Sequence, residues 1–111
     1  MEHVMFVIDH DEAQAEPTGE LLAQHVAWLE SVEGVRVFGA RLRLPSDATV
    51  VRRRGDEVLV TAGPFAETTE WIGGFDVLEV PTSDDAIVIA ARHPGAADGC
   101  VEVRAAWPFE A

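Results

Sequence analysis

Two stretches of this sequence, one at each end, repeat the same order of strand, helix and strand. The first passes from a β-branched, apolar segment at 3–8 through a helix to a strand at 35–42. The second starts with a strand at 75–80, continues with a helix from Thr82 or Ser83 to about Arg92, and ends with a strand at 100–107. Two split βαβ units on one antiparallel sheet predict an α+β, ferredoxin-like sandwich with both helices on one face.

The first helix is predicted from its start, its stop and its periodicity. It opens at Pro17–Glu20, and Gly34 is a typical C-terminal stop because glycine can adopt positive φ. Apolar residues and one histidine follow i, i+3, i+4, i+7 spacing, which predicts an inward stripe. The stripe consists of Leu22, His25, Val26, Leu29 and Val32.

A β-hairpin is predicted between the two units. Segments 49–53 and 57–61 are strand-like, and Gly55-Asp56 lies between them. Arg52-Arg53-Arg54 immediately precedes this turn. We interpret these arginines as the polar tip of the hairpin rather than as an anion site.

The length and composition indicate one globular domain spanning residues 1–111. The longest apolar runs fall far short of the roughly 20 residues that span a bilayer, and the N-terminus has no signal-peptide pattern. A single cysteine, Cys100, cannot form an internal disulfide, which fits a reducing compartment. We therefore expect a cytoplasmic protein in which Cys100 is a buried, inert thiol.

The charge is strongly negative. The chain has 20 acidic and 8 basic residues, and its formal net charge is −12. Such a surface repels phosphate groups, so nucleic acid and anionic membranes are poor candidate partners.

The predicted sheet is apolar on both sides. In the first strand Val4, Phe6 and Ile8 alternate with Met5 and Val7, and the strand from 75 also has apolar side chains in both phases. Helices cover only one face of such a sheet. An exposed apolar face is typical of an interface, and a second copy is its simplest cover, so we predict a homodimer through the sheet faces.

The stretch VLVTAGPFAETTEWIGGF at 58–75 resembles the signature of YCII-related proteins of the DGPF type. The signature reads Asp-Gly-Pro-Phe-Ala-Glu-Thr-Lys-Glu, followed by Gly-Gly-Phe or Gly-Gly-Tyr. AQHVAWLES at 23–31, ATVVRRRGDEVLV at 48–60 and VEVRAAWPF at 101–109 are similar to the corresponding helix, hairpin and last strand. This resemblance implies a dimeric α+β barrel.

The resemblance implies two kinds of function. Relatives in the wider group have a histidine and an aspartate that face a small pocket, and one resembles a lyase that acts on chlorinated aromatics. Others are encoded beside, or fused to, extracytoplasmic-function sigma factors. One hypothesis is therefore a small-molecule-binding protein, such as a cofactor-free lyase or isomerase, with His25 as proton carrier. The alternative is a non-catalytic interaction module, such as a partner of such a sigma factor.

The chain departs from the signature at the aspartate and at the lysine, which are replaced by Ala62 and Thr69. The family aspartate is interpreted as a carboxylate that orients a histidine or exchanges a proton with it. His25 therefore lacks this partner unless Glu67, Glu70 or Asp76 replaces it. The alternative interpretation is that His25 is a structural residue of the core, on the apolar stripe of the first helix.

The 61–75 stretch is also the predicted ligand-binding loop, sealing a pocket between the first helix and the sheet. Its glycines permit close backbone approach, and its aromatic side chains could line a pocket, although a purely structural turn explains the same residues. The candidates are Gly63, Pro64, Phe65, Trp71 and Gly74. The mixed cluster at 9–12 is predicted to be a surface loop, and we expect no metal site and no cofactor.

Overall fold

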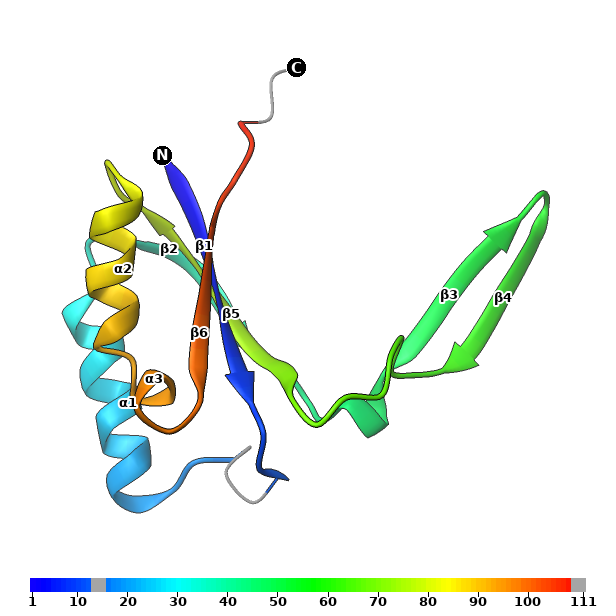
Figure 1. Cartoon of the computed structure of the whole chain (residues 1–111), viewed down its shortest axis with the longest axis horizontal. Coiled ribbons are helices and arrows are strands. Elements are labelled where there is room, and N and C mark those ends of the chain that lie inside the picture. Colours follow the sequence, from blue (N-terminus) through cyan, green and yellow to red (C-terminus); the bar gives the residue numbers. More distant parts are fainter. Residues whose placement is uncertain (13–15, 109–111) are drawn as a thin grey trace.

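The computed structural model describes residues 1–12 and 16–108, which form an α+β sandwich with an extended hairpin (Figure 1). Four strands make an antiparallel sheet in the order β2-β5-β1-β6. Their bounds are β1 Glu2–Asp9, β2 Arg36–Arg41, β5 Trp71–Glu79 and β6 Cys100–Ala105. This strand order confirms the predicted ferredoxin-like fold, in which the two central strands come from different βαβ units.

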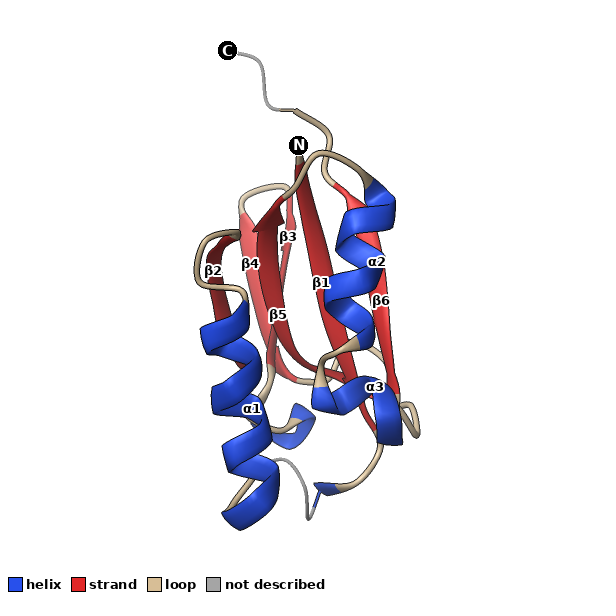
Figure 2. Cartoon of the chain, turned by 90° about the vertical axis from the view of Figure 1, so that its left-hand side faces the viewer, coloured by secondary structure: helices blue, strands red, loops and turns tan. Residues whose placement is uncertain are grey.

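Helices cover one face of this sheet (Figure 2). The helices are α1 Gly19–Ser31, α2 Ser83–Ala91 and α3 Pro94–Asp98, and a short 3₁₀ turn, η2, spans Pro45–Asp47. The α2 start is the one expected, because the Thr82 hydroxyl accepts a hydrogen bond from the Asp85 backbone N–H. The α3 helix was not predicted. Its N-cap is His93, and Pro94 occupies the first turn, where a missing N–H costs nothing.

The buried stripe of α1 differs from the prediction. Trp28 and Val32 are buried and His25 is half-buried, whereas Leu22, Val26 and Leu29 are exposed. The prediction was therefore wrong for these three residues. The reason is Trp28, whose indole N–H donates a hydrogen bond to the Ile89 carbonyl of α2 at 3.1 Å. Burial of this large side chain turns the helix so that the 25/28/32 positions face inward.

The core lies between the sheet and the helices. Its residues come from β1, α1, β5 and α2, and they are Met5, Trp28, Val32, Leu78, Val80, Ala86 and Ala90.

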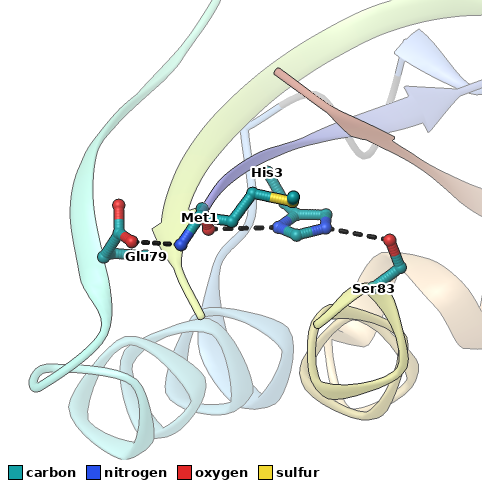
Figure 3. A network of polar contacts seen from close by, with 4 residues as sticks. All are labelled: Met1, His3, Glu79 and Ser83. Carbon is teal, nitrogen blue, oxygen red and sulfur yellow. Dashed lines mark hydrogen bonds and ion pairs between the residues drawn. The ribbon is translucent and has the colours of Figure 1, made fainter. Parts of the chain in front are cut away.

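His3 joins β1 to the start of α2 at the edge of this core (Figure 3). Its Nδ1 lies 3.2 Å from the Met1 carbonyl oxygen, which can only accept, so Nδ1 carries the proton and donates. Its Nε2 then accepts from the Ser83 hydroxyl at 2.9 Å. The N-terminal ammonium group contacts the Glu79 carboxylate beside this pair. His3 is therefore a satisfied core histidine.

The opposite face of the sheet has no helical cover (Figures 1 and 2). Strand pairing places Val4 beside Val77 and Phe6 beside Phe75 on this open face. Phe38 of β2 lies beside Val77 and is 59% exposed. Cys100 pairs with Ile8 on edge strand β6 and is exposed, so the prediction of a buried thiol was wrong, because an edge position without a covering layer leaves it open to solvent.

The predicted hairpin consists of β3 Thr49–Arg54 and β4 Glu57–Ala62, joined by a turn in which Gly55 has φ +62°. It forms its own two-stranded sheet and projects away from the body on the side opposite the helices (Figure 1). The radius of gyration is 15.9 Å, whereas a compact domain of this length has about 13 Å. We call this hairpin the arm.

No helix in the described parts of the chain is long and apolar enough to cross a membrane.

The packing of Met5 gives a direct stability prediction. Met5 is fully buried in the core, so Met5→Ala is expected to lower the free energy of unfolding by roughly 2–5 kcal/mol. The control is Ile87→Ala on the exposed side of α2, for which a change within about 0.5 kcal/mol is expected. Chemical denaturation measures both. Equal losses for the two variants would show that the core is not where the sheet meets the helices.

Candidate functional site

A cavity of about 330 Å³ lies between α1 and the helix-covered face of the sheet. This volume is within the range of small-molecule sites. Its walls are apolar, with Leu22, Trp28, Leu29 and Phe75 among the lining residues. Its ionisable groups are the side chains of Asp9, His25, Arg36, Arg41, Asp76 and His93. Apolar walls with a few convergent polar groups are the usual composition of a binding site.

Asp9 reaches this cavity from the end of β1. The pairing of β1 with β5 shifts register between Val7 and Ile8, next to the glycine pair of β5. A Cβ atom at Gly73 would lie 1.7 Å from Asp9 Oδ2, a distance that no side chain could tolerate. The absence of a side chain at Gly73 therefore makes room for the Asp9 carboxylate.

His25 enters the cavity from α1 and interacts with this carboxylate. Burial lowers the pKa of His25, and the negative charge of Asp9 is the strongest of the charges that act on it, raising the pKa in the opposite direction. Burial also raises the pKa of Asp9, which the positive charge of His25 counteracts. Both groups line the same cavity and act on each other through their charges, so neutral His25 can accept a proton and the charge of Asp9 favours the resulting imidazolium.

Asp76 lies in the same cavity but is held by an arginine. Arg36 Nε donates to Asp76 Oδ1 at 2.7 Å, and Asp76 is buried. A Cβ atom at Gly39 would lie 2.3 Å from the same oxygen, so a glycine in β2 makes room for this ion pair. The charge of Asp76 also raises the pKa of His25, but less strongly than the charge of Asp9 does. The main contact of the Asp76 carboxylate is therefore its ion pair with Arg36, which joins β5 to β2.

His93 presents a fixed hydrogen-bond donor to the cavity. Its Nδ1 accepts from the Gly95 backbone N–H at 2.9 Å. A backbone N–H can only donate, so in neutral His93 the proton is on Nε2. No other hydrogen bond to the ring occurs among the described residues, and none of their side-chain nitrogens is both buried and unpaired. Nε2–H therefore keeps some accessible surface, and His93 is one of the residues that line the cavity.

The His93 ring is held by aromatic neighbours. Its centroid is 4.7 Å from that of Trp28 and 5.1 Å from that of His25, both in edge-to-face geometry. Burial lowers the pKa of His93 to about 4, and the nearby His25 acts in the same direction. At neutral pH His93 is consequently uncharged and donates through Nε2.

The structure brings only part of the predicted site together. His25, Asp76 and Gly74 line the cavity. The remaining candidates do not line it: Gly63, Pro64, Phe65 and Glu67 lie between the arm and β5, and Trp71 begins β5.

Only the β5 end of the stretch predicted to seal the pocket reaches it within one chain: Gly73, Gly74 and Phe75 line the cavity, and the part before β5 does not. Phe65 is 82% exposed, and its ring lies 6.0 Å from the Arg52 guanidinium of the arm. Ala62 ends β4 and is also absent from the cavity wall. A carboxylate at Ala62 would therefore not face His25 of the same chain.

Sequence reasoning missed Asp9 and His93 as site residues. Asp9 could have been found by strand alternation, because it shares the phase of Met5 and Val7, which face the helices. His93 precedes Pro94, a pattern that fits an N-cap, but only the fold shows that its ring meets α1. The 9–12 segment does not form a metal site with the described residues, which contain no cluster of three or more metal-ligating side chains.

Comparisons with known proteins agree with this architecture. The family model described as YCII-related domain matches residues 1–110. A search of curated proteins found no match. Among solved structures, the chain is similar to 5-chloro-2-hydroxyhydroquinone dehydrochlorinase (TftG) from Burkholderia phenoliruptrix AC1100, in complex with 2,5-dihydroxybenzoquinone. The TM-score is 0.58 at 16% identity, covering 99% of this chain and 96% of that chain.

The depressed pKa of His93 predicts acid sensitivity. The folded state keeps His93 neutral down to about pH 4, whereas an unfolded histidine binds a proton near pH 6.5, so stability is lost as the pH falls through this window. We expect His93→Asn, whose amide can still cap α3, to reduce this loss by on the order of 2 kcal/mol. The loss is measured as the difference between the free energies of unfolding in urea at pH 7 and at pH 4.5. An unchanged pH dependence would contradict the buried neutral imidazole.

The pairing of Asp9 with His25 predicts a pKa change in a variant. Asp9→Asn removes the charge that most strongly raises the pKa of His25, so the pKa of His25 is expected to fall further. NMR titration of the imidazole signals measures this value, and Asp98→Asn, which removes a carboxylate beside His10, is the matched control. If both variants leave the His25 titration unchanged, the two groups are not coupled.

Proposed function

Because the chain belongs to the YCII-related family, we propose that it binds a small, planar, oxygen-bearing molecule and acts on it as a cofactor-free lyase or isomerase. The observation that carries this proposal is that Asp9, His25 and His93 line one apolar cavity, and that the neutral ring of His93 carries an Nε2–H donor. Proton transfer from a substrate whose oxygen gains negative charge requires a general base and a hydrogen-bond donor in the same cavity.

His25 is the proton carrier in this proposal. Its neutral imidazole takes a proton from a hydroxyl or an activated carbon of the ligand, and Asp9 stabilises the imidazolium that forms. The electron pair left on the ligand moves into its conjugated system. In a lyase it expels a leaving group as an anion, and in an isomerase the proton returns at a different atom.

His93 cannot replace His25 in this role. Its Nδ1 lone pair is engaged by the Gly95 N–H, and its Nε2 already carries a proton. It can instead donate a hydrogen bond to an oxygen that becomes negative during the reaction. The two histidines thus have different tasks, one as base and one as donor.

The cavity walls favour a planar ring. Trp28 provides aromatic surface, and Leu22 and Leu29 provide aliphatic surface. The similar dehydrochlorinase structure is a complex with 2,5-dihydroxybenzoquinone, and this compound combines a flat ring with four oxygens. A hydroxylated quinone or phenol is therefore the ligand class that we propose for this chain.

We also propose that the protein is a homodimer whose open sheet faces point toward each other. The support is the apolar, helix-free face formed around Val4, Phe6, Phe75 and Val77, and the exposed Phe38 at its side. A cytoplasmic location is part of the same proposal and fits the single exposed cysteine.

Ligand binding tests the proposed function. 2,5-Dihydroxybenzoquinone is expected to bind with one site per chain and to quench the fluorescence of Trp28, which lines the cavity. His25→Gln and His93→Asn should each weaken binding roughly 10-fold, because each removes a charge-assisted or neutral hydrogen bond to the ligand.

The matched control is His10→Gln, which removes an exposed histidine outside this cavity. It should bind like the original chain. Fluorescence titration and calorimetry give the dissociation constants. Equal affinities for all four proteins, or absence of binding at millimolar ligand, would contradict the proposal.

A further inference from the structure

The arm has one strongly apolar face that nothing covers within the chain. Cross-strand pairing places Val51 opposite Val60, and strand alternation adds Val58 to the same side. We call these three residues the valine face. Their side chains are largely exposed: Val51 is 64% exposed, Val60 62% and Val58 59%. β-branched residues in this pattern are typical of a strand surface that packs against another layer.

An isolated hairpin with such a face is unfavourable in water. Two-stranded ribbons are marginally stable without a third layer, and exposed apolar strands invite pairing with other chains. The arm makes a two-stranded sheet of its own rather than extending the β2-β5-β1-β6 sheet. In Figure 1 the arm diverges from the open face of its own sheet, and the three valines are exposed to solvent.

Each chain also carries an apolar surface that lacks a cover, namely the open face of the sheet. Its central strands offer half-buried Phe6 and Phe75, and Phe38 beside them is 59% exposed. One chain therefore has two uncovered apolar surfaces of the same kind. Two chains related by a two-fold axis would cover all four of their apolar surfaces in a single association step.

Charge favours a second copy of this chain as the occupant. The arm contains the only run of consecutive basic residues in the sequence, Arg52-Arg53-Arg54, and cross-strand pairing places Arg53 beside Val58 on the valine face. The rest of the chain is strongly acidic, and the open face carries exposed Glu102 opposite Phe6 on β6. Arginines at the arm tip would offset the repulsion between two bodies of net charge −12.

We propose that the arm of each protomer packs its valine face against the open sheet face of a second copy. This inference rests on the proposed homodimer and specifies how it is held together: the arms lie between the two sheets rather than in solvent. The connection 63–70 leads directly from the arm to β5, so arm exchange also carries this stretch toward the partner.

Photo-crosslinking tests the contact directly. Chains carrying p-benzoylphenylalanine in place of Val60 are mixed with ¹⁵N-labelled chains without it, and mass spectrometry identifies crosslinked peptides of mixed isotope composition. The expected partners are peptides from β1, β2 or β5 of the labelled copy. The matched control places the same probe at Thr61, which lies on the opposite face of the arm, and should give several-fold fewer such crosslinks.

A substitution provides the second measurement. Val60→Glu places a charge on the valine face and is expected to raise the dimer dissociation constant at least 10-fold in analytical ultracentrifugation. Thr61→Glu adds the same charge on the other face and should change it less than threefold. Near-UV circular dichroism of Trp28 reports whether both variants keep the core intact.

The outcomes separate the two proposals. A dimer whose Val60 crosslinks stay within one chain, or whose affinity responds equally to both glutamates, overturns arm exchange and leaves the homodimer standing. A chain that sediments as a monomer at 100 μM overturns both. Neither result bears on ligand binding in the Asp9–His25 cavity, which its own titration decides.

Discussion

The hydrogen bond from the Trp28 indole to the Ile89 carbonyl sets the orientation of α1, and the cavity depends on it. A tryptophan needs both apolar contact and a partner for its N–H when buried, and this position provides both. With Trp28 fixed, the position three residues earlier faces the sheet, which brings His25 toward Asp9. The same orientation leaves Val26 exposed outside the cavity, whereas Leu22 and Leu29 are exposed where they line it.

Three histidines in this small domain show how backbone contacts assign different roles to one side chain. His3 donates through Nδ1 to a carbonyl and accepts at Nε2 from Ser83, so both of its nitrogens are satisfied. His93 has the opposite tautomer, because a backbone N–H occupies Nδ1. His25 has no such backbone partner among its resolved interactions and responds instead to the charges of Asp9, Arg41 and Asp76. Of the two histidines that line the cavity, only His25 is left without a backbone partner on its ring among the described residues.

The sequence predicted the body of the fold well, because its strands and helices have clear periodicity and clear boundaries. Alternating apolar residues and the proline–threonine start of α2 placed these elements to within a few residues. The inward face of α1 was mispredicted, because its apolar residues can form two neighbouring stripes, and only the packing of Trp28 decides between them. The site was predicted in part: His25 followed from the helix pattern, but its partner Asp9 depends on a register shift and on a contact with Gly73 more than sixty residues away. Long-range contacts of this kind leave no local pattern in a single sequence.

The clearance between Asp9 and Gly73 has a consequence for how such chains can diverge. A side chain at position 73 would occupy the space that the carboxylate uses, so glycine alone fits there for as long as the acid remains. Loss of the acid would release that restriction, and any larger residue that followed would make the loss hard to reverse. The residues allowed at the two positions therefore depend on each other: the acid at the end of β1 requires a glycine near the start of β5.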